Sequence, residues 1–139
     1  MTADETFLET LRIRAVLERY CYLLDGGEVD QLLELFTEDC VFTMMGQTYE
    51  GKAQFAGVWA GVQAVPRPTT LHALVNPRIE VDGAQATATS SFVFVNRNVE
   101  GATQVPFAGR YLDALSRGAD GCWRLNQRRV ETLARPVPA

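Results

Sequence analysis

The first part of the chain repeats its apolar positions with the spacing of an amphipathic helix. Between residues 5 and 24, apolar side chains recur at i, i+3, i+4 and i+7, which predicts one long helix. The run Asp25-Gly26-Gly27 is expected to end it, because glycine commonly follows the last turn of a helix. The same spacing restarts over residues 28–36 and predicts a second, shorter helix.

Beyond residue 36 the pattern changes and becomes less regular. Residues 40–45 predict a strand that ends in a turn at Gly46, and residues 52–63 predict a third helix. Glycines inside that third helix weaken its intrinsic propensity, so tertiary packing would have to hold it. Residues 65–68 are expected to form a loop.

The rest of the chain alternates as β-strands do. The four strand-like runs cover residues 69–81, 86–98, 104–116 and 122–133, and turn residues separate them. The short links predict an antiparallel meander. Helices followed by long strands indicate an α+β fold. A length of 139 residues suits a single domain over 1–139, with a C-terminal tail over 133–139.

One strand segment predicts a partner. The run SSFVFV at residues 90–95 is apolar on both faces, which is typical of a sheet that is covered on each side. The predicted helices can cover one face. We therefore expect a second copy of the chain to cover the other face, as a homodimer through the sheet.

Composition and charge narrow the partners and the compartment. Hydrophobic residues make up 47% and charged residues 22%, with a formal net charge of −4. The basic residues are scattered apart from Arg128-Arg129, so we expect no nucleic acid partner. No apolar stretch approaches the ~20 residues of a membrane span. The acidic N-terminus shows no signal pattern, so we expect no membrane association and a cytoplasmic location.

The chemical groups available for a site are few. The three cysteines are far apart and are expected to be free thiols, and a single histidine argues against a zinc cluster. The chain has no glycine-rich phosphate loop at the start of a helix and no Gly-x-Ser-x-Gly elbow. We therefore expect no metal and no cofactor, and the remaining groups suit proton transfer by side chains alone.

Asp25 and His72 are the leading candidates for that chemistry. Asp25 falls at a helix C-terminus, where the helix dipole disfavours a carboxylate, yet its spacing from Cys21 places it on the inward stripe. His72 shares one strand face with Leu74 and Asn76, a mixture typical of a half-polar pocket lining. Both residues also have a purely structural interpretation, as an Asp-Gly-Gly turn and as a hydrogen-bonded core histidine.

Other candidates would either line a pocket or fill the core. Tyr20 and Tyr22 could each offer a phenol to a cavity, although Tyr20 belongs to the core stripe. Arg128 and Arg129 lie on opposite faces of the last strand, so at most one points inward, and Arg110 is a third arginine to consider. Apolar wall would come from Met44, Trp59, Phe92, Phe94 and Tyr111.

Several segments together resemble a known family. They are RYCYLLDGGEVDQLLELFTEDCVF, TYEGKAQF, TLHALVNPRIEVDG, GRYLDAL and GCWRLNQRRV, and they span about residues 5–132. In order and motif they resemble the SnoaL-like branch of the nuclear transport factor 2-like superfamily. The resemblance implies a cone-shaped α+β barrel, in which a curved antiparallel sheet wraps a long N-terminal helix and two shorter helices. It also implies an apolar pocket inside the cone and, in many members, a dimer through the sheet.

The resemblance also implies a chemistry. The branch includes relatives of scytalone dehydratase, bile-acid 7α-dehydratase and hexachlorocyclohexane dehydrochlorinase, which use an Asp–His dyad and no cofactor. Asp25 and His72 fall on the dyad positions, and Tyr20 falls where the bile-acid enzymes carry a phenol. The dehydrochlorinases have a lysine at that place, which favours an oxygen leaving group here. The chain lacks the second pocket histidine of scytalone dehydratase, and the superfamily also contains non-catalytic dioxygenase subunits.

The resulting hypothesis is a dehydratase or isomerase acting on a small apolar cyclic or carbonyl substrate. His72 would be the general base, Asp25 would orient it, and Tyr20 would hydrogen-bond the substrate oxygen. Substrate contacts would come from Asn76, Met44, Trp59, Phe92, Phe94, Tyr111 and Arg129. The alternative is a non-catalytic protein of the same fold that binds a small ligand or serves as a partner subunit.

Overall fold

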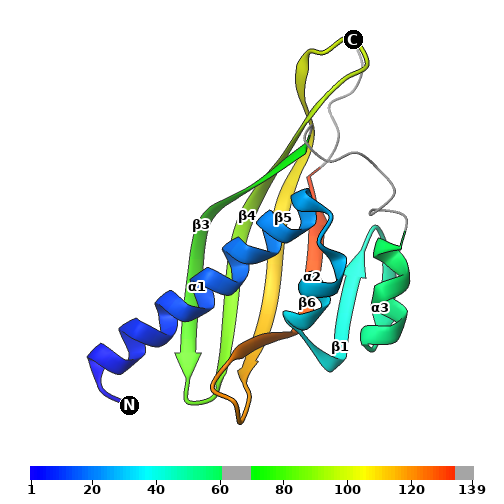
Figure 1. Ribbon diagram of the computed structural model, residues 1–139. Coiled ribbons are helices and arrows are strands. Elements are labelled where there is room, and N and C mark those ends of the chain that lie inside the picture. The colour runs from blue at the N-terminus through cyan, green and yellow to red at the C-terminus, as the bar shows by residue number, and fades with distance from the viewer. Residues whose placement is uncertain (61–69, 134–139) are drawn as a thin grey trace.

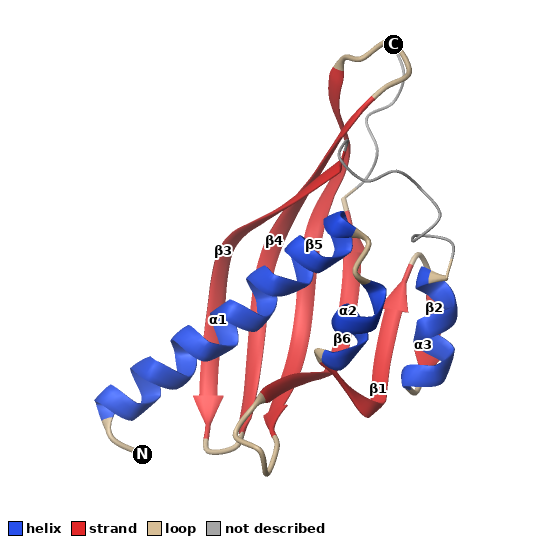
Figure 2. Ribbon diagram, in the orientation of Figure 1, coloured by secondary structure: helices blue, strands red, loops and turns tan. Residues whose placement is uncertain are grey.

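A long helix lies across one face of a curved, six-stranded sheet (Figures 1 and 2). The structure is a computed structural model that describes residues 1–60 and 70–133. Its elements are α1 (Ala3–Gly26), α2 (Val29–Glu34), β1 (Phe36–Met44), β2 (Gln47–Glu50), α3 (Lys52–Trp59), β3 (Thr70–Asp82), β4 (Gln85–Arg97), β5 (Thr103–Arg117) and β6 (Trp123–Thr132). The strand order is β2-β1-β6-β5-β4-β3, so β3 is an edge strand. The α+β prediction is confirmed, but the sheet is mixed rather than wholly antiparallel, because β1 and β6 run parallel.

The predicted first helix is longer than its apolar pattern. A capping box starts α1: the Thr2 side chain accepts from the Glu5 N–H, and the Glu5 carboxylate accepts from the Thr2 N–H. Gly27 ends it in the left-handed conformation, at φ 69°. Polar capping residues therefore extend the helix beyond the predicted range of 5–24. None of the helices in the described ranges is both long and apolar enough to cross a membrane.

The segment after α1 differs from the prediction in three places, and in one of them β1 begins at Phe36 instead of residue 40. The second helix, predicted over 28–36, ends at Glu34, because Phe36 already pairs with Leu125 at the start of a parallel β1–β6 ladder. A short strand, β2, follows a turn in which Met45 and Gly46 both have positive φ, the geometry of a tight hairpin. The turn was predicted. The polar sequence of β2 carries no apolar alternation and gave no strand prediction.

The third helix covers part of its predicted range. α3 runs from Lys52 to Trp59, and residues 61–63 and the predicted loop at 65–68 lie outside the described residues. Phe55 and Trp59, one turn apart, face Phe42 of β1 with ring centroids 4.5 and 5.9 Å away. These aromatic contacts hold a helix whose own propensity is low.

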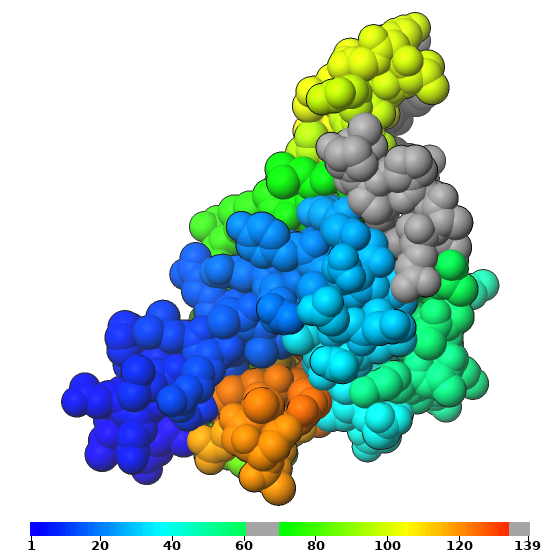
Figure 3. Space-filling view, in the orientation of Figure 1, coloured from blue at the N-terminus to red at the C-terminus, as the bar shows by residue number. Residues whose placement is uncertain are grey.

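The four long strands form the predicted antiparallel meander β3-β4-β5-β6, each within two residues of its predicted ends. The tip of the β4–β5 hairpin projects from the rest of the molecule (Figures 1 and 3). Within β3, Asn76 has a positive φ of 52°, and the pairing with β4 shifts between Val75 and Arg78. This β-bulge reverses which residues face α1, because alternation has a period of two.

The core between α1 and the sheet is aromatic and closely packed. Phe92 stacks on Tyr111 at 4.5 Å, and a side chain at Gly109 would meet the Glu131 carbonyl oxygen at 2.0 Å. It would also come within 2.9 Å of the Phe92 ring. Glycine at this position therefore lets the aromatic layer lie against the sheet backbone.

A charged pair is buried in the same core. Arg128 and Asp113 each have 0% side-chain exposure and share two hydrogen bonds, Nε to Oδ1 at 2.8 Å and Nη2 to Oδ2 at 2.9 Å. The guanidinium lies 3.9 Å from the ring centroid of Tyr111 and 4.2 Å from that of Tyr20. Burial by itself lowers the pKa of Arg128, but the adjacent carboxylate outweighs burial and raises it. Arg128 therefore stays charged inside the protein.

We expect Asp113→Asn to destabilise the protein by about 3–5 kcal/mol, because it leaves a buried guanidinium without its counter-charge. The double variant Asp113→Leu with Arg128→Met removes both charges and should be less destabilised than Asp113→Asn. Urea denaturation followed by circular dichroism measures both. Asp120→Asn, which breaks an exposed ion pair with Arg124, is the control and should stay near wild type. Near-wild-type stability of Asp113→Asn would contradict the expectation.

Candidate active site

The carboxylate of Asp25 joins the end of α1 to the start of β3. Its Oδ1 lies 2.7 Å from Nδ1 of the His72 ring and accepts a longer hydrogen bond, 3.4 Å, from the Thr70 hydroxyl. Its Oδ2 accepts the backbone N–H of His72 at 2.7 Å. Both oxygens are therefore held, and the position of the histidine ring is fixed relative to the helix.

The local sequence explains why these groups meet. β3 is an edge strand, so an N–H that points away from β4 has no strand partner, and that of His72 is donated to Asp25. A carboxylate at a helix C-terminus is electrostatically unfavourable, and the three donors from β3 offset this. The predicted conflict at Asp25 is therefore resolved by contacts with a distant strand.

Electrostatics keep Asp25 ionised. Burial alone raises the pKa of its carboxyl, but hydrogen bonds from the ring and backbone of His72, with the histidine's charge, outweigh burial and lower it. The ionised carboxylate requires the proton of the neutral ring to sit on Nδ1. Nε2 then carries the lone pair, and no hydrogen bond to Nε2 occurs among the described residues. The side chains are 14% (His72) and 18% (Asp25) exposed, so solvent or a ligand can reach the pair.

A cavity of about 350 Å³ opens beside the pair, between α1 and β3. It is lined by Glu18, Cys21, Tyr22, Asp25, Thr70, Leu71, His72 and Leu74. Phe94 packs on the other side of the histidine ring, with centroids 4.7 Å apart. The cavity therefore combines an oriented imidazole with a mixed apolar and polar wall, which can move a proton on a small bound molecule.

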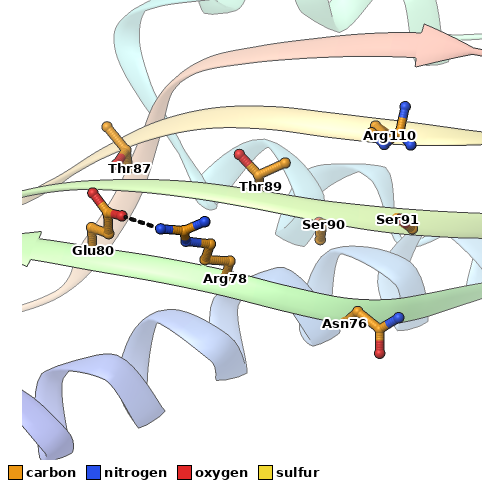
Figure 4. A pocket seen from close by; sticks show the side chains of 8 residues that line it. All are labelled: Asn76, Arg78, Glu80, Thr87, Thr89, Ser90, Ser91 and Arg110. Carbon is orange, nitrogen blue, oxygen red and sulfur yellow. Dashed lines mark hydrogen bonds and ion pairs between the residues drawn. The ribbon is translucent and has the colours of Figure 1, made fainter.

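Asn76 lies elsewhere, because the β-bulge turns it away from the face of His72. It lines a different hollow, of about 360 Å³, together with Arg78, Glu80 and Arg110 (Figure 4). The expectation that Asn76 shares a face with His72 is wrong, since simple alternation does not survive a bulge.

Tyr20 is buried in the core rather than on the cavity wall. Its ring packs against Phe36, Tyr111 and Arg128, and it is not among the residues that line the cavity. Burial raises the pKa of its phenol to about 12, so the hydroxyl stays protonated. Its catalytic role stays a prediction. The phenol that lines the cavity is that of Tyr22.

The remaining predicted contacts spread over the fold. Phe94 contacts His72, whereas Trp59, Phe92 and Tyr111 are core residues and Met44 packs against the core from its edge. Arg129 is exposed and lies 3.4 Å from Glu131. Arg128 points inward instead. The sequence leaves open which of the two arginines points inward, and the predicted substrate contact, Arg129, is the exposed one.

Two residues of the cavity wall were not predicted, although their spacing in the sequence indicates their position. Glu18 and Cys21 precede Asp25 by seven and four residues, so they share its helix face. The same spacing, counted back from Asp25, identifies this wall of the cavity. No cluster of three or more histidine, cysteine or acidic side chains suited to a metal occurs in residues 1–60 and 70–133.

Comparisons with known proteins agree with this architecture. Residues 5–129 match the family model described as SnoaL-like domain. No curated protein matches the chain. An Asp-to-Asn variant of Rv3472, a protein of unknown function from Mycobacterium tuberculosis, is 29% identical, with a TM-score of 0.83 over 96% of this chain and 76% of that one.

Two further solved structures show the same fold. A protein of Novosphingobium aromaticivorans, provisionally named a scytalone dehydratase, is 24% identical, with a TM-score of 0.84 over 96% of this chain and 89% of that one. ActVI-ORFA from Streptomyces coelicolor is 20% identical, with a TM-score of 0.75 over 88% and 96%. At these identities the likeness concerns the fold alone.

The lowered pKa of Asp25 predicts a loss of stability in acid. Its contribution is fully present above the unfolded value of about 3.9 and is lost as pH falls through the lower folded value. The difference in unfolding free energy between wild type and Asp25→Asn should therefore shrink below about pH 4. Urea titrations across that range measure it. In a His72→Gln background the change should be smaller, and a difference that does not vary with pH would contradict the expectation.

Proposed function

We propose that this chain, which belongs to the SnoaL-like domain family of the nuclear transport factor 2-like superfamily, is a cofactor-independent dehydratase or isomerase. The observation that carries the proposal is the fixed Asp25–His72 pair beside the cavity. A histidine held by a carboxylate through Nδ1 is a base at Nε2, and it lies where a small molecule can reach it.

In the dehydration, Nε2 of His72 takes the proton from a carbon next to the substrate carbonyl. The electrons of the broken C–H bond form an enolate and then a C=C bond, as the C–O bond to the β-hydroxyl breaks. The imidazolium returns its proton to the departing hydroxyl, which leaves as water. In an isomerisation the same imidazolium gives the proton to another carbon. Asp25 stabilises the imidazolium in both cases, because its carboxylate is 2.7 Å away.

The proposed substrate is a small apolar cyclic or carbonyl compound. The lining residues are uncharged or apolar apart from Glu18, Asp25 and His72, and Phe94 flanks the imidazole. A cavity of about 350 Å³ is at the small end of ligand sites, which run from about 300 to 1,000 Å³. In this mechanism Arg128 keeps the core rigid behind the dyad, and the hydrogen bond from Tyr20 to the substrate oxygen stays a prediction.

A second candidate is a non-catalytic ligand-binding or partner-subunit protein. The observation that favours it is the hydrogen bonding of Asp25, whose three donors all come from β3 and tie helix to strand. A purely structural pair would look the same. The two candidates predict different effects of truncating His72. The free energy of unfolding should fall more if the Asp25–His72 pair is structural than if it is an active-site pair.

We further propose that the chain forms a homodimer through the face of the sheet that points away from α1. Val93 alternates with the inward Phe92 and Phe94, and it pairs with Ala73 and Ala108. These small apolar side chains form a partly exposed patch on the part of that face made by β3, β4 and β5. We also propose a reducing, cytoplasmic compartment, since Cys21, Cys40 and Cys122 are free.

The proton-transfer step can be tested with β-tetralone, an uncharged bicyclic ketone with acidic α-hydrogens. We expect the protein to accelerate the exchange of these hydrogens in D₂O, followed by NMR. Asp25→Asn and His72→Gln should each slow the protein-dependent rate by about 10²- to 10⁴-fold. Arg129→Gln, which changes an exposed side chain of β6 outside the cavity lining, is the control and should retain the exchange rate.

The same variants separate the two candidate functions. Folded variants that keep full exchange rates would sink the dyad mechanism. A large fall in melting temperature for His72→Ala, together with no acceleration by the wild-type protein, would favour the structural pair and the binding role. Little change in melting temperature with loss of exchange would favour catalysis.

The dimer predicts a change of mass on a single substitution. Val93→Glu places a charge at the centre of the apolar patch and should convert a wild-type dimer into a monomer, measured by sedimentation velocity. Val99→Glu, at the exposed hairpin tip, is the matched control and should leave the dimer intact. A monomeric wild-type protein would contradict the proposal.

A further inference from the structure

The cavity beside the dyad has a mouth whose residues the proposed mechanism does not use. On α1, Glu18, Tyr22 and Asp25 follow one another along a single face of the helix. Asp25 stands at the inner end with His72, and Tyr22 and Glu18 stand toward solvent. Tyr22 and Glu18 therefore line the same cavity as the imidazole and can contact a molecule bound there.

Tyr22 is the most unusual of these residues. It lines the cavity, yet it is 81% exposed, and no ring contact involves it among the described residues. Cys21, one position earlier, is buried, and Leu74 of β3, which packs against the core, lines the same cavity. A large aromatic ring left open beside a partly apolar wall can bury its face against a molecule bound in the cavity.

The charges at the mouth are of one sign. Glu18 and Asp25 line the cavity, and no lysine or arginine is among the described residues that do so. Arg14 holds the Glu18 carboxylate at 2.7 Å but stands outside the lining. An anionic ligand would lose its hydration beside two carboxylates without gaining a cation. An uncharged ligand avoids that penalty.

We propose that Tyr22 and Glu18 set the substrate class of this cavity. Tyr22 packs on the apolar ring of an uncharged substrate, and Glu18 rejects anions of the same shape. The volume of about 350 Å³ limits the buried part to one or two fused rings. This inference rests on the proposed function, because it concerns the substrate of the same site.

Binding of β-tetralone tests the role of Tyr22, with isothermal titration calorimetry as the readout. We expect Tyr22→Ala to raise the Kd about tenfold, since the ligand loses its aromatic contact. Tyr22→Phe should restore binding, because the ring and not the hydroxyl makes the contact. Leu8→Ala, an exposed side chain of α1 outside the cavity, is the matched control and should bind as wild type. Unchanged binding by Tyr22→Ala would overturn this half of the inference.

Binding of β-naphthoate, an anion of nearly the same shape, tests the role of Glu18. Wild type should bind it at least about tenfold more weakly than β-tetralone, and Glu18→Gln should remove most of that gap without changing β-tetralone binding. Glu80→Gln, an exposed glutamate on the other face of the sheet, should leave the gap unchanged. Equal affinity of wild type for both compounds would overturn the inference, as would no binding of β-tetralone at about 1 mM.

Failure of this inference and failure of the proposed function are distinguishable, because binding and exchange are measured separately. Selective binding that persists in His72→Gln, without exchange activity in wild type, would support the selectivity role of Tyr22 and Glu18 and refute the proton-transfer mechanism. Exchange that depends on Asp25 and His72 but is unaffected by Tyr22→Ala and Glu18→Gln would support the mechanism and refute the selectivity role of Tyr22 and Glu18. Circular dichroism melting curves show whether each variant is folded.

Discussion

The capture of the Asp25 carboxylate by the edge strand is the interaction on which the site depends. Three donors from β3 reach the Asp25 carboxylate at the last turn of α1. The residues that donate them follow Asp25 in the chain by 45 positions (Thr70) and 47 positions (His72). Without them, the carboxylate would stand at the negative end of the helix dipole with no compensation. With them, one carboxylate ties the end of α1 to β3 and fixes the tautomer of His72 beside the cavity.

Two of the ion pairs, Arg128–Asp113 and Asp25–His72, show how enclosure decides between stability and reactivity. Arg128 and Asp113 are fully buried, joined by two mutual hydrogen bonds and flanked by two aromatic rings. Such a pair can stiffen the core but has no partner to exchange a proton with. The Asp25–His72 pair is partly exposed and keeps one ring nitrogen uncommitted. Only the second arrangement can work as a base, because its proton has somewhere to come from.

The sequence predicts those features that depend on one regular spacing of apolar residues or on one helix end. The helices, the meander and the inward direction of Asp25 followed from spacing, dipole and turn residues. Asn76 was misplaced because a left-handed residue in mid-strand breaks the alternation. The choice between Arg128 and Arg129 required the register of β6 against β5. Pairing between distant segments determines that register, and no property of either arginine reveals it.

The edge position of β3 explains why site and sheet border coincide. An unpaired strand edge exposes backbone donors and acceptors and invites pairing with other chains. Along β3 the exposure is managed in two ways. Near its start, Asp25 takes up the free N–H of His72. Farther along, the bulge at Asn76, the absence of an N–H at Pro77 and the charged pair Arg78–Glu80 discourage a neighbouring strand. A free edge thus supplies the donor that orients the histidine, and the same contact covers part of that edge.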